Sequence, residues 1–155
     1  MDILTQYEIP YLHPLAVHFP LVLLLLGAAA SALYAGLGTA TWRWAALILI
    51  VLGAASSIWA EETGETLADT VDGEPIATVV LPDHKDGAEW TVRVSILTVL
   101  VLASLSVWAR RQPERFVPKE PLAGRILVLL LAGLAAGLVA WTAHLGGIMV
   151  WGVPT

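Results

Sequence analysis

Long stretches without any charged side chain constrain this chain more than any other feature of its sequence. No acidic or basic residue lies between Glu8 and Arg43, and none follows Arg125. A helix needs about 20 apolar residues to cross a hydrocarbon core of about 30 Å. With 57% hydrophobic and 14% charged residues, the chain is also more apolar than an ordinary soluble domain. The sequence therefore predicts an integral membrane protein.

The apolar residues divide into four candidate spans. They lie at 14–37, 43–60, 92–110 and 122–145. The second and third spans are short, but tryptophans of the kind found at membrane interfaces flank them: Trp42, Trp44, Trp59, Trp90 and Trp108. We expect an all-α fold, a polytopic four-transmembrane-helix up-down bundle that forms a single membrane domain over 1–155, with a small cap made by the outer loop 61–91.

Short elements are expected inside the 61–91 loop. Residues 61 to about 70 should continue the second helix beyond the membrane, with Glu61 and Glu65 one turn apart on the same face. Residues 76–81 include a β-branched run that could lie extended. Pro82 is typical of a helix entry, which predicts that the third helix begins near His84.

Charge is distributed unevenly between the two ends of the predicted bundle. Of the 8 basic residues, six surround the first and third connections: Arg43, Arg110, Arg111, Arg115, Lys119 and Arg125. Of the 13 acidic residues, eleven lie at the other end. By the positive-inside rule the basic connections are cytoplasmic. We therefore expect a bacterial inner-membrane protein with periplasmic N- and C-termini, and the acidic excess excludes a nucleic-acid partner.

The chain has no cysteine. Iron–sulfur clusters, zinc–thiolate sites and covalently attached c-type haem all require cysteine ligands. Any metal in this protein must therefore be held by histidine and carboxylate.

The histidines are predicted to meet at the outer end of the bundle, because successive helices run in opposite directions. They are His13, His18, His84 and His144. The carboxylates Glu61 and Glu65 end the second helix at the same level. His18 and His144 lie at the edge of the hydrocarbon, where an imidazole without a partner is costly and a polar group is typically functional.

Small residues follow one another at helical spacing in the fourth span. Gly133, Gly137 and Ala140 lead towards His144. Such a stripe indicates close contact between helices. The alternative is a slot for a flat cofactor such as a porphyrin.

Four segments carry a resemblance to a known family: HPLAVHFP at 13–20, TGE at 63–65, His84 with Glu89, and TAHLGG at 142–147. Together they resemble a bacterial four-helix membrane family catalogued as domain of unknown function 2231, over almost the whole chain. Trp151 stands where this family is expected to have tyrosine, and Lys85 follows His84 where an acidic residue is expected.

The resemblance implies a role in electron transfer. Relatives look to be joined, in some proteins, to cytochrome c or Rieske domains, which indicates a respiratory or photosynthetic system. On that basis we expect other membrane subunits as partners, together with the lipid bilayer. A soluble cytochrome or Rieske-type protein on the outer side is the expected redox partner.

Three interpretations of the histidines remain open. In the first, His18 and His144 are the axial ligands of a b-type haem, whose porphyrin lies in the groove of Gly133, Gly137 and Ala140. In the second, a non-haem site binds iron, zinc or copper through His13, His84, Glu61 and Glu65. In the third, the chain is a cofactor-free accessory or scaffold subunit of a larger membrane complex. No catalytic motif is present, so a non-catalytic redox or accessory subunit is favoured over an enzyme acting alone.

Overall fold

The computed structural model describes residues 12–69, 75–111 and 120–152, and this part of the chain is helical almost throughout. Its helices are α1 (His13–Ala16), α2 (His18–Leu37), α3 (Ala40–Ala68), α4 (Pro75–Arg110) and α5 (Leu122–Trp151). Four stretches of the described chain are long and apolar enough to cross a membrane: His13–Leu37, Ala40–Ala68, Thr78–Arg110 and Leu122–Trp151. The predicted all-α bundle is thus confirmed.

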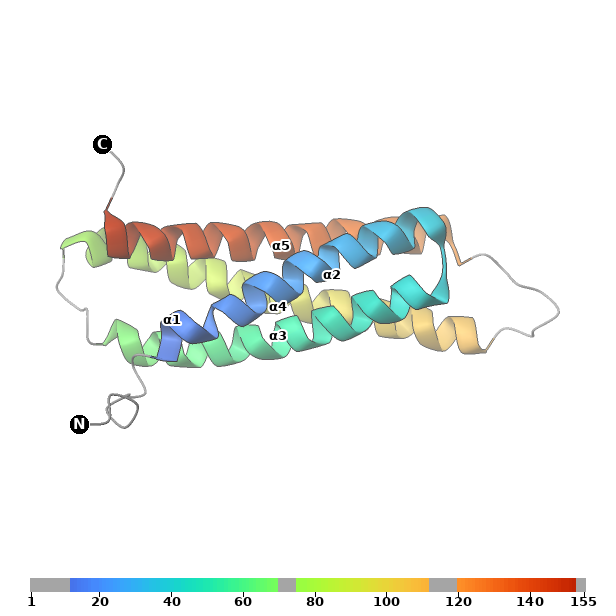
Figure 1. Cartoon of the computed structure of the whole chain (residues 1–155), viewed down its shortest axis with the longest axis horizontal. Helices are drawn as coiled ribbons and strands as arrows, with labels where there is room; N and C mark the ends of the chain where they lie inside the picture. Colours follow the sequence, from blue (N-terminus) through green and yellow to red (C-terminus); the bar gives the residue numbers. More distant parts are fainter. Residues whose placement is uncertain (1–11, 70–74, 112–119, 153–155) are drawn as a thin grey trace.

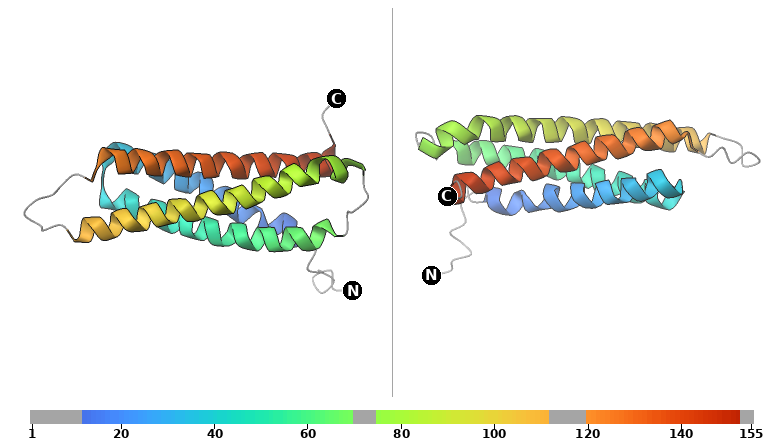
Figure 2. Two further views of the ribbon diagram at one scale, coloured as in Figure 1. Left: turned by 180° about the vertical axis from the view of Figure 1, so that it is seen from behind. Right: turned by 90° about the horizontal axis from the view of Figure 1, so that it is seen from above.

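The helices form an up-down bundle in which consecutive helices run in opposite directions (Figure 1). Helix α2 packs against α3 and α5, and α4 packs against the same two neighbours. The views from behind and from above show the four long helices lying lengthwise beside one another (Figure 2). The start of α1, the start of α4 and the end of α5 therefore share one end of the bundle.

Glycines allow α2 and α3 to approach each other closely. The side chain of Ile50 lies over Gly27, where an added Cβ would come 2.5 Å from Ile50 Cδ1. Leu24 lies over Gly53 in the same way, with its Cδ2 2.6 Å from the corresponding Cβ position. Packing of this kind is a principal source of attraction between helices in lipid, where apolar surface is not expelled from water.

Large apolar side chains also cover the outside of the bundle, as expected for a surface that faces lipid. They occur on every long helix, for example Leu26, Ile48, Leu100 and Leu130, which are about half exposed. The side chains buried between the helices include Leu24, Tyr34, Ile50, Leu102 and Val128. The bundle is thus mainly apolar inside and outside, and the charged groups of the described residues lie towards its two ends.

The 61–91 segment differs from the loop predicted for it. Helix α3 continues to Ala68, which confirms the predicted extension of the second helix. The predicted extended run at 76–81 and the helix start near His84 are wrong, because α4 begins at Pro75 and passes through Pro82. Proline suits the first helical position, and packing of α4 along α5 outweighs the β-propensity of the residues that follow.

The first transmembrane helix is interrupted near its start. Helices α1 and α2 are separated by Val17, and Pro20 follows within the first turn of α2. Proline has no N–H to donate to the carbonyl of Ala16. The helical hydrogen-bond pattern is therefore interrupted beside His18.

Candidate functional site

All four histidines lie at one end of the bundle, which we call the histidine end. His13 begins α1 and His18 begins α2, whereas His84 lies within α4 and His144 lies in the last turns of α5. Residues separated by more than a hundred positions in the sequence are brought to one level by the alternating direction of the helices (Figure 1).

Two of these histidines, His13 and His84, face each other across the bundle. Their ring centroids are 6.3 Å apart and the ring planes are inclined at 79°. Both side chains are partly buried. The ring contact joins the first residue of α1 to the first third of α4, and it depends on α4 extending beyond the membrane span that the sequence predicted.

Backbone carbonyls fix the orientation of both rings. His13 Nδ1 donates to the carbonyl of Ala60 at 2.9 Å, with the Thr63 hydroxyl oxygen 3.3 Å away. His84 Nδ1 donates to the carbonyl of Thr142 at 2.9 Å. Because a carbonyl can only accept a hydrogen bond, Nδ1 carries the proton in each ring. In the neutral imidazoles Nε2 then keeps its lone pair, which is the arrangement found in most metal-ligating histidines.

Two glycines give the imidazoles their space. A Cβ on Gly64 of α3 would lie 2.8 Å from His13 Cε1, and a Cβ on Gly146 of α5 would lie 3.3 Å from His84 Cε1. These glycines belong to the TGE and TAHLGG segments that the sequence singled out. Helices α3 and α5 therefore form close walls beside the two rings.

His18 and His144 are placed differently. Both are exposed on the surface of the bundle. His18 Nδ1 donates to the carbonyl of Pro14 at 2.6 Å, one turn back in the chain, and the His144 ring lies 5.8 Å from that of Trp141. Within the described residues, no hydrogen bond or ring contact joins these two histidines to each other.

The small-residue groove of α5 faces outwards. Gly133, Gly137 and Ala140 are all exposed. A Cβ added to Gly133 or Gly137 would meet no atom within 4 Å. The groove therefore opens towards lipid and does not adjoin the His13–His84 pair by any contact within the described chain.

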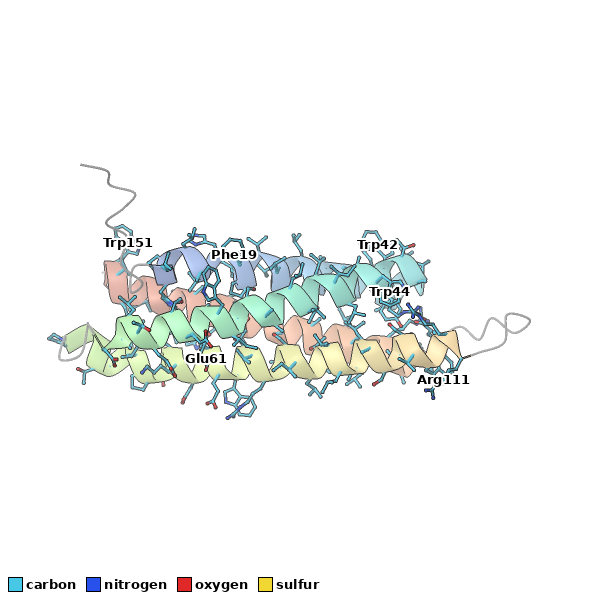
Figure 3. All side chains as sticks on the ribbon, turned by 90° about the horizontal axis from the view of Figure 1, so that it is seen from below. Phe19, Trp42, Trp44, Glu61, Arg111 and Trp151 are labelled. Carbon is cyan, nitrogen blue, oxygen red and sulfur yellow. The ribbon has the colours of Figure 1, made fainter. Side chains whose placement is uncertain are left out.

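Among the described residues, no hydrogen bond or ion pair joins Glu61 or Glu65 to the rings of His13 and His84. Glu61 is half-buried on α3 (Figure 3), and it interacts electrostatically with Glu65, Glu89 and Arg93. Arg93 in turn forms an exposed ion pair with Glu89. Among the residues that the structure describes, no group of three His, Cys, Asp or Glu side chains is arranged to hold a metal ion.

A second polar cluster lies at the opposite end, which we call the arginine end. Arg43 forms an ion pair with Glu120, and the Tyr34 hydroxyl donates to the same carboxylate. Sequence reasoning used Arg43 only as a marker of orientation and missed this cluster. The available signal was Tyr34 itself, a hydroxyl-bearing side chain near the end of an uncharged span.

Comparison with known proteins gives one match. The family model described as predicted membrane protein (DUF2231) matches residues 9–154. No curated protein and no solved structure matches the chain.

Proposed function

The chain belongs to the DUF2231 family of predicted membrane proteins, and from that premise we propose that it is a membrane subunit of an electron-transfer system that binds haem b. In this proposal His13 and His84 are the axial ligands of the haem iron. The observation that carries it is the facing pair of imidazoles, each fixed by a backbone carbonyl.

The separation of the two rings suits one iron between them. A bond from a metal to an imidazole nitrogen is about 2 Å long, so two rings that ligate one ion have centroids about 6 Å apart. The centroids of His13 and His84 are 6.3 Å apart. Because the two Nδ1 atoms are occupied by carbonyls, Nε2 is the nitrogen that each ring offers.

The number of protein ligands favours haem over a non-haem ion. A non-haem site usually draws three or more ligands from the protein. A porphyrin supplies four nitrogens of its own, so two histidines complete the coordination of haem iron. We thus assign the haem ligands to His13 and His84, whose rings are in contact, in place of His18 and His144, which are exposed. When bound, haem would supply a one-electron carrier whose potential depends on its ligands and burial.

The charge of the histidine end supports a basic redox partner. Eleven of the 13 acidic residues and only two of the 8 basic residues belong to this end by the sequence pattern. A soluble cytochrome or Rieske-type protein with a basic docking surface would be attracted to it. We place this end on the periplasmic side of a bacterial inner membrane, where such partners operate, and we expect other membrane subunits beside the bundle.

Absorption spectra test the haem assignment. The full chain is purified from its native membrane, and oxidised and reduced spectra are recorded with iron content for the wild type and for each His→Ala variant. We expect a Soret band in the wild type that is lost or strongly reduced in His13→Ala and His84→Ala, because each removes one axial ligand. His18→Ala and His144→Ala are matched controls, since they remove histidines at the same end, and their spectra should change little.

Other outcomes have definite meanings. If only His18→Ala and His144→Ala lose the Soret band, the haem ligands are His18 and His144, the pair predicted from the sequence. Stoichiometric zinc or copper without a Soret band would replace haem by a non-haem site. Folded wild-type protein that contains neither metal nor haem would refute the proposal and favour an accessory or scaffold subunit.

A further inference from the structure

The polar cluster at the arginine end joins three parts of the chain that are far apart in sequence. Glu120 precedes α5 and accepts from Tyr34 of α2 while pairing with Arg43 of α3. The Arg43 side chain is 6% exposed and that of Glu120 is 9% exposed, whereas Tyr34 is fully buried. The guanidinium of Arg125, on α5, lies against Gly38, and it is close enough to interact electrostatically with the Tyr34 hydroxyl.

Two of the buried donors in this cluster have no acceptor in the part of the chain that the structure describes. Within residues 12–69, 75–111 and 120–152, the Nε atoms of Arg43 and Arg125 make no hydrogen bond, and both are buried. A buried N–H of a charged group without an acceptor is unfavourable, because its interaction with water is lost and not replaced. The unpartnered Nε atoms therefore indicate a missing acceptor.

The charges of the cluster do not balance either. Among its described residues, Arg43 and Arg125 contribute two positive charges, and Glu120 contributes one negative charge. The missing acceptor is thus expected to be an anion.

The position of the cluster indicates which anion. Trp42, Trp44 and Arg111 lie at the same end of the bundle (Figure 3). Tryptophan and arginine at the end of a transmembrane helix are typical of the headgroup layer, where lipid phosphates lie. Guanidinium groups present a planar fork of donors that matches phosphate oxygens.

We propose that Arg43 and Arg125 form a binding site for a phosphate group at the arginine end, of the kind carried by an anionic membrane lipid. Glu120 and Tyr34 hold Arg43 in place, and Gly38 leaves room for Arg125. The site lies at the opposite end of the bundle from His13 and His84, so it does not depend on the haem assignment.

Thermal unfolding of the purified full chain in detergent tests this site. Phosphatidylglycerol and inorganic phosphate are titrated separately, with sodium chloride at matched ionic strength, and native mass spectrometry counts retained lipid. A ligand that binds the folded state raises the unfolding temperature in a saturable way. We expect saturation with phosphatidylglycerol and apparent binding about tenfold or more weaker in Arg125→Gln, because hydrogen bonds to a charged partner are lost.

Arg110→Gln is the matched control, since it removes the same charge from the same end but from an exposed side chain. It should bind like the wild type, whereas Arg125→Lys, which keeps the charge but not the fork, should be intermediate. Saturation by inorganic phosphate as well would identify the phosphate group alone as sufficient, and saturation by lipid only would identify the lipid headgroup. The site is refuted if sodium chloride has the same effect, if Arg125→Gln binds like the wild type, or if Arg110→Gln loses as much affinity as Arg125→Gln.

Discussion

Gly64 determines where the ring of His13 can lie. A Cβ at this position would come 2.8 Å from His13 Cε1 and 3.1 Å from its Nδ1. The group that must move is the end of a side chain, so Gly64→Ala should displace the ring and leave the helix intact. We expect the variant to lose most of its haem, measured as Soret absorbance per mole of protein, while its unfolding temperature is unchanged or slightly higher.

Gly147→Ala is the control for that change. It adds the same methyl group at the histidine end, where a Cβ would meet nothing within 4 Å. Its haem content should equal that of the wild type. If Gly64→Ala retains full haem content, His13 is not a haem ligand.

The sequence predicted which residues gather at the histidine end but not which of them pair. Gathering follows from the up-down order of the helices alone. Pairing depends on how each helix is rotated and how far it extends, and His84 meets His13 from the part of α4 that extends beyond the predicted span 92–110. The depth of His18 and His144 could be read from the sequence, but their outward orientation could not.

The turn between α2 and α3 depends on a left-handed glycine. Gly38 ends α2 with φ +65°, and a Cβ there would lie 2.4 Å from Arg125 Nη1. A non-glycine residue in this conformation costs about 1–2 kcal/mol. Gly38→Ala should therefore lower the free energy of unfolding by about that amount and disturb Arg125.

Gly36→Ala separates the effect of the turn from that of an added methyl group. Gly36 is inside α2 and a Cβ there would meet nothing within 4 Å. Alanine in place of glycine within a helix stabilises by about 0.5–1 kcal/mol. Reversible unfolding in mixed detergent micelles measures both variants, and an equal effect of the two substitutions would contradict the role of Gly38.

Charge and hydropathy predicted the membrane-spanning part of each helix well, but they predicted poorly where the helices begin and end. The middle parts of α3 and α5 coincide with apolar runs of the sequence. In lipid every backbone N–H and C=O group needs a hydrogen-bond partner, and a helix supplies these partners within itself. Outside the hydrocarbon that requirement ends, and local propensity competes with packing. Residues 76–81 become helical in α4 although their composition suits a strand.

Two helices of the bundle are longer than the hydrocarbon core is thick, and they extend beyond it mainly at the histidine end. Helix α3 has 29 residues and α4 has 36, whereas a helix needs only about 20 to cross the hydrocarbon. The surplus lies mainly at the histidine end, because the charge-free part of α3 stops before Glu61 and that of α4 starts after Arg93. The His13–His84 pair is thereby lifted to the membrane edge, where a soluble partner could approach it.

The basic residues predict that the histidine end faces the periplasm. Six of the 8 Lys and Arg lie at the arginine end, and their number near the spans sets orientation, whereas acidic residues contribute little. The chain has no cysteine, so single cysteines at Asp69, the exposed end of α3, and at Gln112, beyond α4, can be labelled without background. In whole cells an impermeant maleimide should label Asp69→Cys at once and Gln112→Cys only after permeabilisation.

Labelling of both after permeabilisation controls for reactivity. Immediate labelling of Gln112→Cys with protection of Asp69→Cys would invert the orientation. It would place the His13–His84 pair on the cytoplasmic side, out of reach of a periplasmic redox partner.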